Sequence, residues 1–268
     1  MQKALQKALQ KAGSHDRIIV GYSGGLDSTV LLHLVKQLFR EERDSLLMAV
    51  HVNHQLSTAA GNWVRHCERQ CRQWKVPFLC LPVDVEAGMG EGLEQAARTA
   101  RYDAFRKAAG AGDLLLLAHH QSDQAETVLL RLVRGSGPLG LRGMEGNVEW
   151  AGFPVIRPLL SCSRTQLESY AAQHHLQWIE DDSNLNREID RNFIRHEIMP
   201  RLRGRWTSVE SSMARSSILA GEASELLDQL GEIDLQSLGG DGVVLDVEGR
   251  EFGRRACITI SPSVDNSV

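Results

Sequence analysis

Short apolar runs alternate with longer helical patterns over the first half of the chain. The apolar runs are hydrophobic on both faces, as strands in the middle of a parallel sheet must be; they read RIIVGY, LLMAVHV, FLCLPVDV and DLLLLAHH. Helical patterns follow them, at roughly Ser28–Glu42, Thr58–Lys75, Glu91–Ala109 and Asp123–Arg134. This repetition predicts an α/β fold with a doubly wound parallel sheet and helices on both sides. Ligands of such sheets bind at the carboxyl ends of the strands.

The pattern is less regular in the second half. The segment Val148–Leu160 predicts one or two edge strands, because Pro154 and Pro158 argue against a central position. A helix is expected over Ser163–His175, with its first residue as the N-cap. A further helix over Ser208–Leu230 leads to a Gly-rich turn and the apolar run VVLDV, after which the periodicity is lost. We therefore expect residues 1–205 to form one large domain and residues 206–268 a short helical extension.

The N-terminus repeats a short unit of Gln, Lys, Ala and Leu. This repeat predicts a small amphipathic helix with Leu5 and Leu9 on one face. We interpret it as a packed helix, with a transit peptide as the alternative, since it lacks the apolar core of a secretory signal. The sequence has no run of about 18 apolar residues, so it predicts no membrane-spanning helix.

The cysteines and the net charge give weaker indications. Five scattered cysteines do not describe a disulfide scaffold. Cys67 and Cys71, four positions apart, are interpreted as small buried side chains rather than ligands. We therefore expect a reducing compartment, the cytoplasm. A net charge of −4 argues weakly against nonspecific binding of polyanions.

Arginines are concentrated in one later segment. They are Arg187, Arg191, Arg195, Arg201, Arg203 and Arg205. Such a stretch is usually a solvated helix face. A phosphate-binding surface is the sharper alternative.

The clearest chemical signal joins the first predicted strand to its helix: Ser23-Gly24-Gly25-Leu26-Asp27-Ser28. Gly24 and Gly25 let the backbone turn sharply and approach phosphate oxygens. The loop amides then point outward at a helix N-terminus, which favours an anion, and both serine hydroxyls can donate to it. Because a carboxylate would repel phosphate unless a cation intervened, Asp27 is predicted to bind Mg²⁺. A Gly-rich turn with an Asp-Ser helix cap is the structural alternative.

This loop resembles the PP-loop of the Rossmann-like ATP pyrophosphatases. That resemblance implies a fold that grips the β and γ phosphates of ATP, frees the α phosphate for attack and releases pyrophosphate. No Lys follows the loop, so it is not a Walker A motif. A GxGxxG match in the Gly-rich segment Gly135–Met144 follows a helix rather than a strand, and we reject it as a dinucleotide site.

A second group of polar residues lies where the fourth predicted strand enters its helix. His119, Asp123 and Glu126 are four and three positions apart, which gathers them on one helix face. Acids in a first helical turn are also ordinary capping chemistry. A His-Asp-Glu cluster at the end of a strand can instead hold a cationic amine, ligate a metal or move a proton.

The segment His119–Met144 also resembles the tRNA(Ile)-lysidine synthetase family, through the pattern HHxxDQAETxLLRLxRGSGPxGLxxM. Further similar motifs lie at His51–Ser57, Leu93–Tyr102, Arg157–Leu160, Asp181–Asn184, Arg191–Arg195 and Pro200. The resemblance implies that ATP adenylates the wobble cytidine of tRNA(Ile) with a CAU anticodon. Free L-lysine then attacks the activated carbon, which gives lysidine and AMP.

This resemblance also implies roles for the predicted site residues. Asp123 and Glu126 would bind the lysine amine, with His119 nearby. Four arginines would hold substrate phosphates or the lysine carboxylate, or stabilise the leaving pyrophosphate, with a surface position as the alternative for each; they are Arg98, Arg101, Arg191 and Arg195. Residues 1–205 would be the adenylating catalytic domain, and residues 206–268 a helical linker with an incomplete tRNA-binding region. Dimers are common in such enzymes, so a homodimer is among the expected assemblies.

The chain departs from the family pattern at two positions. Gln55 replaces a common Gly, so the turn there differs or needs a positive φ at some cost. Ser122 stands where an acid is common, which removes one potential metal or amine contact.

Three other functions remain open. A tRNA thiolase of the PP-loop type would use a CxxC pair, whereas Cys67 and Cys71 form CxxxC. An amidating relative would need an ammonia-producing partner domain. A non-catalytic nucleotide- or RNA-binding relative is the alternative from a different class; the intact loop glycines and Asp27 argue against it.

Overall fold

The centre of the computed structural model, which describes residues 1–39, 46–55, 60–84, 93–150, 152–180, 186–237, 244–246 and 259–261, is a six-stranded sheet. Its strand order is β3-β2-β1-β4-β6-β5. The strands are β1 Arg17–Gly21, β2 Leu47–Asn53, β3 Phe78–Pro82, β4 Asp113–Leu116, β5 Asn147–Trp150 and β6 Phe153–Ile156. Only β5 runs antiparallel to its neighbour. The predicted α/β fold is confirmed, with an antiparallel strand at one edge.

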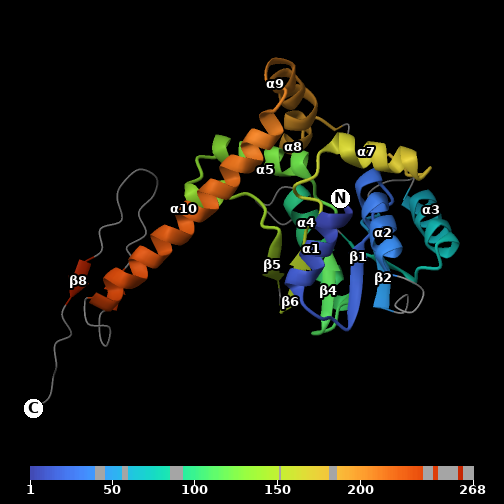
Figure 1. The fold of residues 1–268 in the computed structure, drawn as a ribbon, viewed down its shortest axis with the longest axis horizontal. Coiled ribbons are helices and arrows are strands. Elements are labelled where there is room, and N and C mark those ends of the chain that lie inside the picture. The colour runs from blue at the N-terminus through green and yellow to red at the C-terminus, as the bar shows by residue number, and fades with distance from the viewer. Residues whose placement is uncertain are drawn as a thin grey trace, which may run out of the picture.

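Helices cover both faces of this sheet (Figure 1). The helices of the described residues are α1 Gln2–Ala12, α2 Leu26–Leu38, α3 Ala60–Gln73, α4 Leu93–Ala108, α5 Gln121–Val133, α6 Pro138–Leu141, α7 Arg164–Gln173, α8 Asp190–Phe193, the π-helix η3 Ile194–Ile198, α9 Met199–Arg205 and α10 Val209–Ser237; α1, α2, α3, α4 and α7 pack on the sheet. Side chains alternate along β1 because successive residues of a strand face opposite sides. Ile18 and Val20 pack with α1, α2, α3 and α7, whereas Ile19 packs with Tyr102 and Phe105 of α4.

Two strands occupy other positions than the sequence predicts. β3 lies at the sheet edge, and its side chains are half-buried rather than buried on both faces. β6 lies inside the sheet, so the expected edge position holds for β5 alone. Pro154 is tolerated there because pairing with β4 begins one residue later, at Val155 opposite Leu115.

One predicted cap and one predicted turn are present, and one predicted loop contains a short helix. Ser163 caps α7 and forms a capping box with Gln166. Gln55 has a φ of 55°, so the positive φ expected at this position is confirmed. Within the Gly-rich segment, Pro138 begins the short helix α6, which the sequence did not predict.

The C-terminal region begins with the long helix α10, which extends away from the sheet (Figure 1). Val209 and Met213 at its start pack against α5 and η3. Farther along, Leu226 and Leu230 are more than half exposed. The apolar run VVLDV contributes β7 Val244–Asp246, which pairs with β8 Thr259–Ser261. None of the described helices is both long and apolar enough for a membrane span.

The N-terminal helix α1 is a packed element, as predicted. Leu5 is fully buried in the main core, and Leu9 packs against the same cluster. We expect Leu5→Ala to lower the free energy of unfolding by about 2–5 kcal/mol, because it leaves a cavity. Gln6→Ala, at an exposed position of the same helix, should change it by less than about 0.5 kcal/mol. Urea unfolding measures both, and equal effects would contradict this packing.

Candidate functional site

The two predicted motifs lie side by side because their strands are neighbours. β1 pairs with β4 in parallel, with Val20 opposite Leu116. The loop that follows β1 and the His-rich segment that follows β4 therefore emerge at the same edge of the sheet. The sequence-based expectation that both motifs gather at the carboxyl ends of the strands is confirmed.

Of the two glycines of the first loop, Gly24 is required by the loop geometry, whereas Gly25 has a φ of −75° and its position has room for a Cβ. Gly24 has a φ of 85°, and a Cβ at this position would lie 2.7 Å from the Sγ of Cys67. Gly25 is the N-cap of α2 and brings no side-chain acceptor to the helix. The first-turn amides therefore have no side-chain cap, as a site that receives a phosphate requires.

The two serines of the loop have different positions. The Ser28 hydroxyl is buried and donates to the carbonyl of Gly25 over 3.1 Å, so it braces the loop from within. Ser23 is exposed, and its hydroxyl lies 3.1 Å from that of Ser28. Leu26 points into the core. Ser23 is thus the serine that an incoming ligand can reach.

Two residues from distant segments support this loop from behind. Cys67 is fully buried, and burial together with Cys71 raises the pKa of its thiol to about 12. The prediction that Cys67 and Cys71 are small buried side chains is confirmed. The backbone N–H of Ile179 donates to the carbonyl of Gly24 over 3.0 Å. No local signal in the sequence predicts this contact.

His120 connects the two motifs, although the sequence analysis singled out only its neighbour. It is the N-cap of α5, and its Nδ1 accepts the N–H of Ser122 over 3.2 Å. In the neutral imidazole this bond leaves the proton on Nε2. Nε2 lies 3.6 Å from Asp27 and 3.5 Å from Asp123. The helix was predicted to begin at Asp123, and the observed start at Gln121 is what makes His120 the N-cap.

Asp123 caps the N-terminus of α5 and also belongs to the acid cluster. Its Oδ2 accepts the backbone N–H of His120 over 3.0 Å, which completes a capping box. Its Oδ1 accepts from Arg195 over 3.0 Å. Burial raises the pKa of this carboxyl, but the charges of His120 and Arg191 lower the pKa by more than burial raises it. The pKa of Asp123 therefore lies well below its usual range.

Glu126 is the most enclosed carboxylate of the site, with a side chain 1% exposed. Arg195 donates to it in bidentate fashion through Nε and Nη2, both over 2.7 Å. Arg191 adds a bond of 3.1 Å from its Nε. Part of the arginine-rich stretch therefore faces the protein rather than solvent.

A local irregularity accompanies these two arginines. The turn Ile194–Ile198 is a π-helix, in which the N–H of Met199 donates to the carbonyl of Ile194. Pro200 follows directly, and proline can neither donate an N–H nor tolerate the carbonyl four residues before it. We attribute the wider turn to this proline. Such π-turns are frequent at functional sites.

His119 is half-buried and lies near Asp123. Burial lowers its pKa well below the usual value; Arg157, Arg101 and Arg191 act in the same direction, and Asp123 opposes them. The imidazole is therefore neutral. Its Nδ1 is buried without a hydrogen-bond partner among the described residues.

The two predicted arginines of α4 occupy different environments. Arg101 lies near enough to His119 to lower its pKa. Arg98 lies over the ring of Tyr102, 5.1 Å from the centroid, in a cation–π arrangement. Arg191 and Arg195, from the later arginine-rich segment, donate side-chain hydrogen bonds to Asp123 and Glu126.

Asp27 lies at the mouth of the loop, and its side chain is 30% exposed. Arg164 at the start of α7 donates to it over 3.0 Å, a contact that the sequence analysis missed. Among the described residues no three His, Cys, Asp or Glu side chains form a metal-binding group. Mg²⁺ at phosphate sites takes one or two carboxylates together with substrate oxygens and waters. The single carboxylate of Asp27 is therefore enough for such a site.

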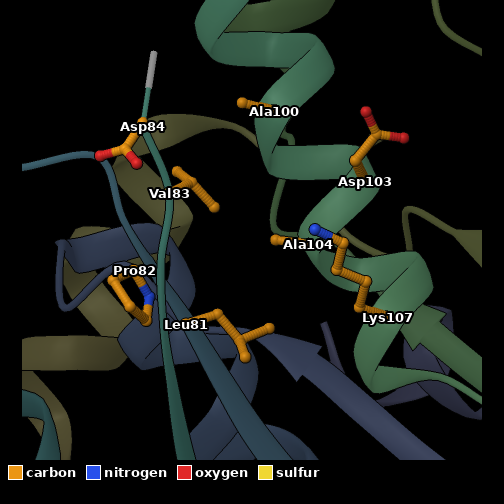
Figure 2. Close-up of a pocket in the computed structure, with 8 residues that line it drawn as sticks. All are labelled: Leu81, Pro82, Val83, Asp84, Ala100, Asp103, Ala104 and Lys107. Atoms are coloured by element: carbon orange, nitrogen blue, oxygen red, sulfur yellow. The ribbon is translucent and has the colours of Figure 1, made fainter.

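A cavity of about 350 Å³ lies between the end of β3 and α4 (Figure 2). Leu81 and Val83 line it from the strand side, and Ala100 and Ala104 from the helix. Its lining includes none of the residues of the cluster described above. Several predicted motif positions lie outside the described residues: Leu56, Ser57 and Asp181–Asn184.

Comparisons with known proteins agree with this geometry. The chain is 46% identical over 245 residues to the tRNA(Ile)-lysidine synthase of Pectobacterium atrosepticum, covering 91% of this chain and 55% of the relative. It is 48% identical over 222 residues to that of Pseudomonas fluorescens, covering 83% and 49%. The chain thus spans about half the length of the curated relatives it matches.

A solved structure shares the fold. The U34-tRNA thiolase from Methanococcus maripaludis, with its [4Fe-4S] cluster, superposes with a TM-score of 0.62 at 13% identity, over 81% of this chain and 76% of its own. The family described as PP-loop domain matches residues 1–202, which include every residue of the site above. The chain therefore belongs to the PP-loop domain family, as the loop after β1 predicts.

Proposed function

We propose that this protein ligates free L-lysine to the wobble cytidine of tRNA(Ile) with a CAU anticodon, at the expense of ATP. The observation that carries the proposal is the junction of a PP-loop with the acid cluster of α5, in a chain 46% identical to a tRNA(Ile)-lysidine synthase. In the first step the cytidine carbonyl oxygen attacks the α phosphorus, and pyrophosphate leaves. In the second step the lysine ε-amine attacks the activated ring carbon, and AMP leaves as lysidine forms.

The loop after β1 serves the first step in this proposal. The α2 N-terminus and the Ser23 hydroxyl bind phosphate oxygens. Asp27 would hold Mg²⁺, which would supply charge neutralisation at the phosphates. Once its oxygen carries AMP, the cytidine ring carbon becomes a good electrophile, because AMP is a good leaving group.

The α5 cluster serves the second step. A lysine ammonium is attracted by Asp123, whose side chain is 12% exposed, whereas Glu126 stays engaged with Arg195. The amine must lose a proton before it attacks. That proton passes to solvent, because burial lowers the pKa of His119 and makes its neutral imidazole a weak base. Arg191 and Arg101 are the candidates for the lysine carboxylate or for substrate phosphates.

The broader assignments follow from the same proposal. Residues 1–205 are the adenylating domain, and residues 206–268 are the helical linker and an incomplete tRNA-binding region. The protein acts in the cytoplasm, where its tRNA is found, and a homodimer is an expected assembly. Sedimentation in the presence and absence of tRNA would measure that assembly.

Transfer of radiolabelled lysine to tRNA(Ile) with a CAU anticodon tests the function directly. With ATP and Mg²⁺ we expect incorporation by the unmodified protein and a loss of at least about a hundredfold for Asp27→Ala, because charge stabilisation at the phosphates is lost. Asp103→Ala is the matched control, since Asp103 is an exposed acid outside the cluster. It should retain full activity.

The failures of this experiment are informative. If pyrophosphate forms but lysine is not incorporated, adenylation stands and the acceptor is wrong. If neither product forms, an affinity measurement with the tRNA separates a non-catalytic binding protein from one that does not hold this tRNA.

His120 offers a second prediction, because its two ring nitrogens have separate contacts. His120→Asn keeps a side-chain acceptor for the helix N-terminus and loses the group near Asp27, whereas His120→Gln places an amide near the Nε2 position. We expect the Asn variant to be more stable than His120→Ala by about 1 kcal/mol. Lysine transfer by the Asn variant should still fall about tenfold, and the Gln variant should transfer faster. Activities that simply follow the urea stabilities would show that His120 acts only as a cap.

A further inference from the structure

Arg164 lies at the entrance to the phosphate loop but comes from a distant part of the chain. It is the first residue of α7, directly after the N-cap Ser163. Its Nη1 donates to both oxygens of Asp27, over 3.0 and 3.3 Å. Its Nε donates to Glu168 over 3.0 Å. The capping box and these bonds fix the guanidinium beside the loop.

The negative charge of Asp27 beside a phosphate loop requires a neighbouring positive charge. Asp27 lies in the first turn of α2, where the helix N-terminus favours an anion. A carboxylate at the same place repels a phosphate, and Arg164 neutralises that carboxylate in the absence of nucleotide. If Asp27 held a metal ion, the Arg164 guanidinium would be without its partner and would lie within reach of the same phosphates. The bonds described above use Nη1 and Nε, and a guanidinium has five donors.

We propose that Arg164 is a phosphate-binding residue for ATP, which exchanges Asp27 for phosphate oxygens when the nucleotide binds. The proposal rests on the use of ATP and deepens the proposed function. Arg164 is 44% exposed, so a ligand reaches it from solvent without rearrangement of the core. Guanidinium groups bind phosphates in bidentate geometry, which an ammonium cannot reproduce.

A simple surface ion pair between α2 and α7 is the competing account. Exposed pairs contribute little to stability, so removing Arg164 should leave the fold intact under either account. Arg72 is the matched control, because it is also an exposed arginine that bonds a glutamate one helical turn away, Glu68. Only the proposal predicts that Arg164 and Arg72 differ in nucleotide binding.

Titration calorimetry with ATP and Mg²⁺, without tRNA or lysine, tests the proposal. We expect Arg164→Gln to weaken ATP binding about tenfold, the effect of losing charge-assisted hydrogen bonds. Arg164→Lys should lie between it and the unmodified protein, and Arg72→Gln should bind normally. ATP binding by Arg164→Gln that equals that of the unmodified protein would overturn the proposal, as would an equal loss in Arg72→Gln.

A second arm tests the exchange itself, with ATP in the presence of a chelator. Asp27→Asn should then bind ATP more tightly than the unmodified protein, because repulsion falls and Arg164 is released. In the Arg164→Gln background this gain should shrink. An equal gain in both backgrounds would show that Asp27 and Arg164 act independently on the nucleotide.

These measurements separate this inference from the proposed reaction. Calorimetry needs no acceptor, so a protein that binds ATP through Arg164 but transfers no lysine would retain this inference and lose the proposed function. Lysine transfer with unchanged ATP affinity in Arg164→Gln would give the opposite result.

Discussion

The parallel pairing of β1 with β4 is the constraint on which the site depends. This pairing places the ends of the two strands next to each other, so the loop after β1 and the N-terminus of α5 share one edge. Asp27 and His120, which are remote in sequence, come within 3.6 Å only because of it. The α7 helix contacts the same edge, because its Arg164 donates to Asp27. A register shift between β1 and β4 would separate Asp27 from His120 and from the acids of α5.

At this edge of the sheet, the negative charges of the site are paired with positive ones. Three carboxylates, Asp27, Asp123 and Glu126, face three guanidiniums, Arg164, Arg191 and Arg195. Charges that leave water must be paired and hydrogen-bonded. A substrate that brings phosphates therefore competes for the arginines, and one that brings an ammonium competes for the carboxylates. Binding in such a site is an exchange of partners, which favours a ligand carrying both signs of charge.

Local chemistry explains which parts of this site the sequence predicts. The strand-turn-helix around Gly24 and Asp27 and the helix start at Asp123 are determined by neighbouring residues, so their types and spacing indicate the structure. The contacts of Arg164 and Ile179 join segments far apart, with 137 positions between Arg164 and Asp27. Such pairs leave no local pattern. The edge position expected for β6 was wrong for the same reason, since Pro154 shows which bond is missing but not which strand lies alongside.

The gradient of burial decides which of these ion pairs can exchange. The side chain of Glu126 is 1% exposed and accepts three hydrogen bonds from Arg191 and Arg195. Removing these arginines would leave its buried negative charge unpaired. Asp123 is 12% and Asp27 30% exposed, and water can replace a partner there at lower cost. Arg195 and Glu126 therefore form the fixed end of the cluster. Arginine–carboxylate pairs thus have two functions in this site. The buried pair of Arg195 and Glu126 holds α5 against η3, whereas the more exposed carboxylate of Asp27 is able to accept a new cation.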